Sequence, residues 1–165
     1  MKKLLLVAAF AVFAFSTVQS QEMKAGVGVA IPMGDYKDAY SFGITADFTY
    51  FFEVNDAFLV GPQAGLLYYM GKDMDLPYGL GTVKMDDAMF LPIGASARYL
   101  LEDFFFGADL GYGIGLAPDG NDGGFFYRPK AGYNFGSIGV VLSYSGVSLE
   151  GASFNSLNAG VEFSF

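Results

Sequence analysis

The stretch Ser156-Leu-Asn-Ala-Gly-Val-Glu-Phe-Ser-Phe165 alternates apolar and polar residues without interruption. The odd-numbered positions are apolar and the even-numbered ones are polar or small: Leu157, Ala159, Val161, Phe163 and Phe165 against Ser156, Asn158, Gly160, Glu162 and Ser164. A period of two residues is typical of a β-strand with one apolar and one polar face. The apolar row needs a cover, which is either a protein core or the hydrocarbon of a lipid bilayer.

Seven earlier segments alternate in the same way, so the sequence predicts an all-β chain of eight strands. The expected strands cover residues 23–31, 41–51, 58–70, 89–99, 104–116, 125–135, 138–144 and 156–165. The segment 58–70 is the least regular, because Leu59, Leu67 and Tyr69 would lie on its polar face. We expect the first segment to pair with the last.

The composition favours strands over helices. The 165 residues are 53% hydrophobic and include 23 Gly, 18 Phe and 11 Tyr, a mixture that suits strands and turns. After residue 20 no apolar run approaches the roughly 20 residues that a membrane-spanning helix needs. The net charge of −8 argues against nucleic acid as a partner, because phosphates would repel the chain.

The sequence contains neither cysteine nor histidine. Disulfides, thiolate metal sites and cysteine nucleophiles are therefore excluded, as are Ser-His-Asp catalysis and histidine-ligated metals. We expect no enzymatic activity, no cofactor and no metal site.

The first twenty residues have the pattern of a secretory signal peptide. Lys2 and Lys3 are followed by a continuous apolar run over 4–15, and Val18 and Ser20 stand three and one residues before Gln21. This pattern predicts cleavage between Ser20 and Gln21, which leaves 21–165 as the folded domain. An uncleaved anchor is the alternative, but the apolar run is short for a membrane span.

The expected connections alternate in length along the chain. The long ones cover 32–40, 71–87, 117–124 and 146–155, and the short ones 53–56, 101–103 and 136–137. In an antiparallel meander all long loops then emerge at one end, with both termini at the other. Outer-membrane barrels show this asymmetry. We therefore predict an eight-stranded antiparallel up-and-down transmembrane β-barrel with periplasmic termini and extracellular loops.

The expected polar faces carry glycines together with seven charged residues. We expect these charges to form a network in the lumen: Lys24, Asp47, Arg98, Asp109, Arg128, Lys130 and Glu162. With the apolar faces outward, the glycines leave room inside for long basic side chains. A structural ion-pair network is the favoured interpretation, and a pore or ligand-binding lumen is the alternative.

Two glycine-rich motifs have ordinary explanations. The stretch Asp119–Gly124 resembles a calcium loop in its acids but lacks the later bidentate Glu, so a turn is expected. The G-x-G-x-G of Gly111–Gly115 lies within a strand and is no nucleotide site. The expected loops are rich in acids, and this acidic exterior is a candidate contact for cations or for an unknown extracellular partner.

The last strand resembles the assembly signal of outer-membrane β-barrel proteins, with Val161, Phe163 and Phe165 at its alternate apolar positions. The mature chain as a whole resembles a small OmpA/OmpX-type barrel of the porin-like outer membrane protein β-barrel domain family. Phe90–Leu101 and Phe105–Gly113 are similar to two central strands of that family. The resemblance implies a place in the outer membrane of a Gram-negative envelope, contact with its lipid, and recognition by the barrel assembly machinery.

These features favour a monomeric, non-enzymatic integral outer-membrane protein without an open pore. Its expected role is structural, or an adhesion-like interaction through acidic external loops. The alternatives are a small porin-like channel or ligand-binding barrel, a lipid-modifying barrel enzyme, and a secreted soluble barrel that carries an apolar ligand.

Overall fold

The computed structural model describes residues 21–75 and 82–165. The predicted signal peptide, including Ser20 on its cleavage site, lies outside the described residues, and Gln21 begins the first strand. Within the described ranges, no helix is both long enough and apolar enough to cross a membrane.

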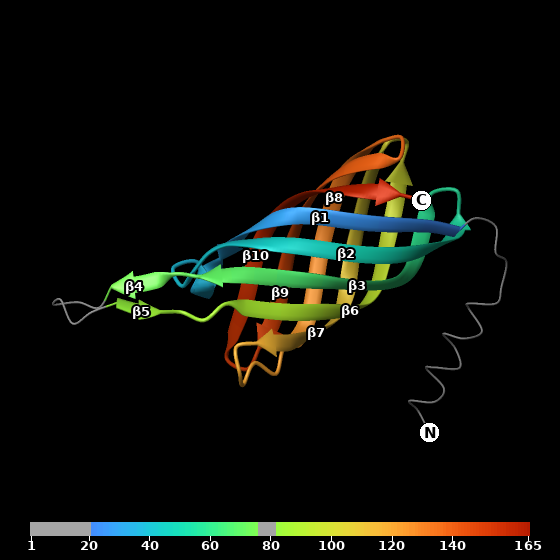
Figure 1. Ribbon diagram of the computed structural model, residues 1–165. Coiled ribbons are helices and arrows are strands. Elements are labelled where there is room, and N and C mark those ends of the chain that lie inside the picture. The colour runs from blue at the N-terminus through green and yellow to red at the C-terminus, as the bar shows by residue number, and fades with distance from the viewer. Residues whose placement is uncertain (1–20, 76–81) are drawn as a thin grey trace, which may run out of the picture.

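Eight long antiparallel strands close into a barrel, as predicted (Figure 1). They are β1 (Gln21–Met33), β2 (Tyr40–Asn55), β3 (Phe58–Gly71), β6 (Ala88–Leu101), β7 (Phe104–Ala117), β8 (Gly124–Phe135), β9 (Ile138–Leu149) and β10 (Ala152–Ser164). Around the barrel the order is β1-β10-β9-β8-β7-β6-β3-β2. The expected pairing of first and last strands is confirmed, with a register from Lys24↔Ser164 to Met33↔Asn155. Closure leaves no unpaired edge, which is the condition for a sheet in lipid.

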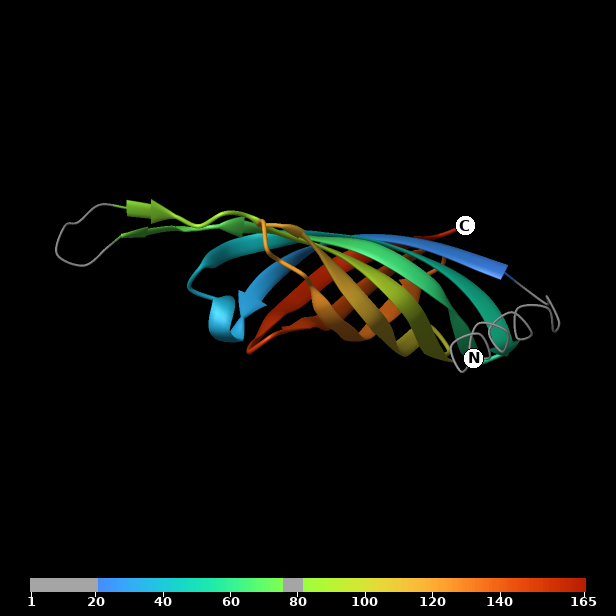
Figure 2. The same cartoon turned by 90° about the horizontal axis from the view of Figure 1, so that it is seen from below.

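The two ends of the barrel differ. One end, called the turn end below, holds Gln21, Phe165 and the tight turns after β2, β6 and β8. The other, called the loop end, holds a 3₁₀ turn, η1 (Gly34–Tyr36), and the ribbon of β4 (Asp73–Asp75) and β5 (Thr82–Lys84). Figures 1 and 2 show this ribbon extending well beyond the barrel. The expected loop 71–87 therefore includes two short paired strands.

The predicted long loop 146–155 is wrong. β9 continues to Leu149 and β10 begins at Ala152, so only a tight turn at residues 150–151 separates them. The strands continue, but the polarity of their inward face changes, because Val147 and Phe154 are apolar residues that point into the barrel. The outward alternation on which the prediction depended stops at this level, although the pairing does not.

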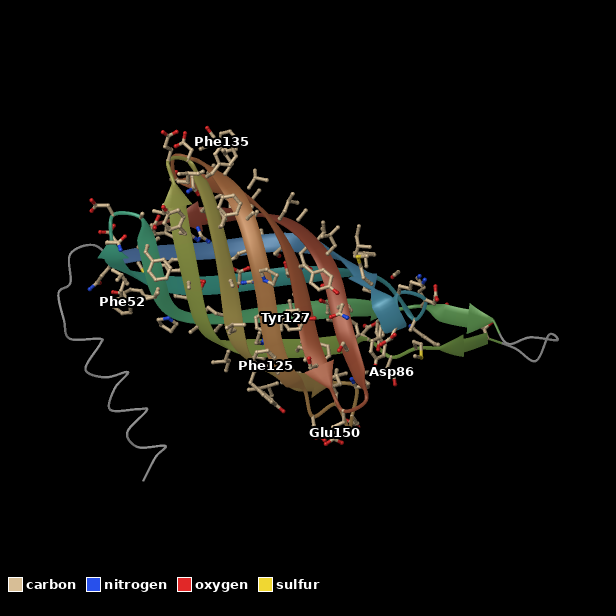
Figure 3. The ribbon with its side chains drawn as sticks, turned by 180° about the vertical axis from the view of Figure 1, so that it is seen from behind. Phe52, Asp86, Phe125, Tyr127, Phe135 and Glu150 are labelled. Atoms are coloured by element: carbon tan, nitrogen blue, oxygen red, sulfur yellow. The ribbon has the colours of Figure 1, made fainter. Side chains whose placement is uncertain are left out.

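A belt of apolar side chains surrounds the barrel on the outside. Every one of the eight long strands contributes to it, for example through Val27, Ile44, Leu66, Ile93, Leu110, Phe125, Leu142 and Leu157. Figure 3 shows Phe125 and Phe135 pointing away from the sheet. Covering each such side chain is worth about 1.5–3 kcal/mol, so the exterior matches hydrocarbon rather than water.

Candidate functional site: a filled lumen below an acidic mouth

The centre of the lumen is a carboxylate that holds two cations. Asp109 on β7 is 0% exposed, and its Oδ2 accepts a hydrogen bond from Arg128 Nε at 2.6 Å. Its Oδ1 lies 2.8 Å from Lys130 Nζ. Arg128 also donates from Nη1 to Asp47 Oδ1 at 2.9 Å. β8 and β2, which carry Arg128 and Asp47, are four places apart in the barrel, so this contact crosses the lumen.

A second ion pair crosses the lumen nearer the turn end. Arg98 on β6 donates from Nη1 and Nη2 to both carboxylate oxygens of Glu162 on β10, at 2.5 and 2.8 Å. The Arg98 guanidinium lies over the Phe105 ring, 3.8 Å from its centroid, and 5.0 Å from that of Phe51. A bidentate contact with a carboxylate, together with stacking on aromatic rings, fixes the orientation of the guanidinium more firmly than a single charge–charge contact does. β6 and β10 also stand on opposite walls.

All seven predicted charged residues therefore lie inside the barrel, in two connected groups. Lys24 joins the second group, with Nζ 3.7 Å from Glu162 Oε1 and hydrogen-bonded to Ser164 Oγ at 2.8 Å. Glu22, which sequence reasoning missed, lies 2.9 Å from Lys24 Nζ. The alternation in the sequence already indicated this position, because Glu22 lies on the even-numbered, inward face of β1.

A hydrogen-bonded polar layer lies next in the lumen, toward the loop end. Tyr69 and Ser156 share a hydrogen bond of 2.7 Å, Ser145 and Ser156 one of 2.9 Å, and Asn158 Nδ2 donates to Ser145 Oγ at 2.9 Å. The cavity between this layer and the charges measures about 30 Å³ and is lined by Asp47, Arg128, Glu162 and Asn158, among others. That volume is of the order of one water molecule.

An aromatic cluster closes the lumen at the loop end. The ring centroid of Phe154 lies 4.5 Å from that of Tyr69, 4.9 Å from Tyr36, 5.1 Å from Tyr40 and 5.3 Å from Phe90. Buried apolar side chains complete the cluster: Ala30, Leu67, Ala88, Phe126 and Val147. The irregular positions Leu67 and Tyr69 of the sequence are thus inward-facing members of this plug.

Above the plug, the loop end holds a cavity of about 460 Å³. Tyr36, Tyr40, Phe90 and Phe154 form its aromatic floor, and the segment 118–123 forms a wall. Among the described residues, three carboxylates line it, those of Asp119, Asp122 and Glu150, and no lysine or arginine does. Figure 3 shows Glu150 at this end of the barrel.

The base of the β4–β5 ribbon is anchored by Asp87. Its carboxylate accepts hydrogen bonds from the Tyr68 hydroxyl and, at 2.9 Å, from the backbone N–H of Gly71. These two donors hold the pKa of Asp87 below its ordinary value, the tyrosine making the larger contribution. The anchor is therefore ionised at neutral pH.

The glycine-rich stretch 119–124 forms its turn through an asparagine. Asn121 Nδ2 donates to the carbonyl of Ala117 at 2.9 Å, and Gly123 N–H donates to Asn121 Oδ1 at 3.1 Å. Over residues 21–75 and 82–165, no three acidic side chains come close enough together to hold a metal ion.

Two residues of the predicted assembly signal, Val161 and Phe163, lie on the outer face of β10, and Phe165 directly follows its last residue, Ser164. All three side chains are exposed, toward the turn end. The backbone of Phe165 pairs with Met23 through N–H···O contacts of 2.9 and 3.4 Å. These side chains are available to lipid or to a partner outside the barrel.

Comparison with known proteins identifies the fold. No protein-family model and no curated protein sequence matches this chain. Among solved structures, the chain is similar to the outer membrane protein Ail of Yersinia pestis in a phospholipid bilayer nanodisc, at 15% identity and a TM-score of 0.58, covering 88% of this chain and 100% of that one. The crystal structure of Ail, the attachment invasion locus protein, gives 13% identity and a TM-score of 0.57, with 89% and 100% covered. A de novo designed transmembrane β-barrel gives 10% and 0.52, with 87% and 95% covered.

At these identities the similarity concerns the fold alone. The chain has the fold of a small outer-membrane β-barrel, as the sequence predicted. The narrower likeness to OmpA/OmpX-type barrels stays a prediction.

Proposed function

We propose that the chain is an integral outer-membrane protein that acts at the cell surface through its loop end, and neither as a channel nor as an enzyme. The observation that carries the proposal is the combination of an apolar outer belt with a lumen filled by ion pairs and aromatic rings. An apolar exterior requires a membrane, and a filled lumen has no path for solutes.

The surface role rests on the asymmetry of the barrel. The turn end has only short connections, whereas the loop end carries η1, the β4–β5 ribbon and the acidic cavity. Short turns on the periplasmic side and longer segments outside are the rule for such barrels, and this rule supports an external position of the loop end. The name of Ail, an attachment invasion locus protein, is consistent with a surface role for a protein of this fold.

The test is extraction and conductance of the purified protein. We expect the chain to require detergent for extraction from outer membranes, and to migrate differently on SDS gels before and after boiling. In planar bilayers it should give no stable single-channel current, because the Asp109 and Arg98 ion pairs and the Phe154 cluster block the lumen. Extraction without detergent would favour a soluble barrel, and reproducible currents would favour a porin-like channel.

The membrane part of the proposal predicts a specific cost for a charge in the outer belt. Leu110 lies midway along β7 and is 54% exposed. Leu110→Arg should lower the free energy of unfolding by about 2–4 kcal/mol, the cost of arginine at the bilayer midplane. Urea unfolding in phosphatidylcholine vesicles measures it.

The matched control for this variant is Ser148→Arg, at an exposed position near the loop end of β9. There the expected cost falls to about 0–1 kcal/mol. Equal effects at the two positions would contradict a bilayer centred on the middle of the barrel.

A further inference from the structure

We propose that the cavity at the loop end is a binding site for a small organic cation that carries an aromatic or similar flat apolar body. This inference rests on the proposed surface role and names the ligand class of the loop end. The ligand would lay its apolar body in the cavity above the floor and keep its charge near the carboxylates of the rim.

The floor supplies the apolar half of the site. Tyr36, Tyr40, Phe90 and Phe154 line the cavity, and Phe154 contacts the other three rings at centroid distances of 4.9–5.3 Å. Tyr40, Phe90 and Phe154 are buried members of the plug, so the floor is held in place by packing beneath it. Preformed aromatic cavities of about 300–1,000 Å³ are typical of small-molecule sites, and this one measures about 460 Å³.

The rim supplies the charge. Asp119, Asp122 and Glu150 are exposed lining residues from two different connections, the β7–β8 segment and the β9–β10 turn. None of the three forms an ion pair with a described residue. The cavity therefore has negative charge above an aromatic floor, and nothing in the described part of the chain neutralises it.

This combination selects among ligand classes. Aromatic faces attract cations through the ring quadrupole, most strongly where water is displaced. The rim repels anions, and a neutral aromatic molecule gains binding free energy only from its contact with the floor. A hydrated divalent cation gains only from the rim, since Ca²⁺ and Mg²⁺ prefer a shell of oxygen ligands. Only a cation with an apolar body uses both halves.

The cavity is a dead end and not the vestibule of a channel. Beneath its floor lie the remaining plug residues, then the polar layer, then the ion pairs that span the lumen. A bound ligand therefore leaves by the way it entered, which fits a receptor or adhesion-type site better than transport.

The first experiment compares four probes on the full barrel in nanodiscs of zwitterionic lipid, by titration calorimetry against empty nanodiscs. The probes are phenethylammonium, neutral 2-phenylethanol, anionic 3-phenylpropanoate and Ca²⁺. We expect saturable binding of phenethylammonium that weakens as salt is added, because the rim charges are exposed. The alcohol should bind at least tenfold more weakly, and the anion and Ca²⁺ should not compete. Equal binding of the amine and the alcohol, or no saturable binding of the amine, would overturn the proposal.

The second experiment separates the cavity from a general acidic surface. In Asp119→Asn/Asp122→Asn/Glu150→Gln the affinity for phenethylammonium should fall about tenfold, because three attractive charges are lost at short range. The matched control, Asp35→Asn/Asp38→Asn/Asp73→Asn, removes the same charge from the loop end but from residues that do not line the cavity. It should retain affinity within about twofold. Equal losses in the two triple variants would sink the proposal.

The third experiment tests the floor. Tyr36→Leu keeps apolar volume but removes a ring, and should weaken amine binding about two- to fivefold while leaving alcohol binding nearly unchanged. Each variant is first checked for the heat-dependent gel shift of the closed barrel. If that shift persists while no probe binds, the ligand site fails and the proposed function stands; if the wild-type chain shows no shift, the proposed function itself fails.

Discussion

Replacing Asp109 by asparagine is expected to lower the free energy of unfolding by about 3–5 kcal/mol. The variant keeps the shape of the side chain but removes the one carboxylate that contacts both Arg128 and Lys130. Arg128 retains Asp47 as a partner at 2.9 Å. The ammonium of Lys130 forms no other ion pair with a described residue, so a buried charge is left uncompensated. Urea titration of the protein refolded in zwitterionic vesicles measures the loss.

A double variant tells whether the lost stability comes from the uncompensated charge of Lys130 or from the absence of the ion pair itself. In Asp109→Asn/Lys130→Met the second substitution removes the uncompensated charge and keeps an apolar chain of similar length. Most of the lost stability should return, because a buried ion pair contributes less than the removal of one partner costs. If the single variant loses under about 1 kcal/mol, or the double variant is as unstable as the single, the lumen charges are solvated and not mutually dependent.

The ion pairs connect walls that the sheet alone does not connect. Arg128–Asp47 and Arg98–Glu162 each join strands four places apart around the barrel. Hydrogen bonds of the sheet run only between neighbouring strands, so these contacts are cross-braces of the lumen. The same side chains therefore brace the barrel and fill its lumen.

The faces of the strands were predictable from the sequence because the bilayer imposes them. Over the middle of the strands the inward residues are mostly polar or small and the outward ones apolar, as the last strand illustrates. The inward rings of Phe51 and Phe105, which lie against the Arg98 guanidinium, are exceptions near the turn end. Above the bilayer this requirement ends, and the faces at Val147 and Phe154 are apolar inside. The alternation of outward apolar and inward polar residues therefore ends before the strands themselves end. This is why 146–155 was expected to be a loop.

The members of the charged network were predictable, but its pairing was not. Alternation places Arg98 and Glu162 on inward faces, yet their contact depends on how far the strands shift relative to one another around the closed barrel. That shift is a property of the whole sheet. The aromatic plug was present in the sequence only as irregularities, at Leu67, Tyr69, Phe90 and Phe126. Apolar residues on a polar face indicate no particular partner.

The glycines of the inward faces allow neighbouring strands to approach, and this predicts a second large effect. Gly94 on β6 and Gly111 on β7 stand directly opposite each other. A Cβ atom on Gly111 would lie 2.1 Å from the carbonyl oxygen of Ile93 and 2.7 Å from the Cα of Gly94. Both obstacles are backbone atoms, which cannot turn aside as a flexible side chain can. The G-x-G-x-G motif that begins at Gly111 is thus a packing feature of the strand.

Gly111→Val is therefore expected to cost more than about 3 kcal/mol, or to prevent closure, because β6 and β7 must separate and lose sheet hydrogen bonds in a medium without water. The fraction of protein that shows the heat-dependent gel shift after refolding into vesicles measures closure.

The matched control is Ala95→Val, next to Gly94 but on the exposed outer face. It should change the free energy of unfolding by no more than about 0.5 kcal/mol. Because both variants add a branched side chain at the same level of the barrel, a difference between them reports the space between the strands and not the residue type. A Gly111→Val protein that closes as well as the control would show that β6 and β7 can separate here at little cost.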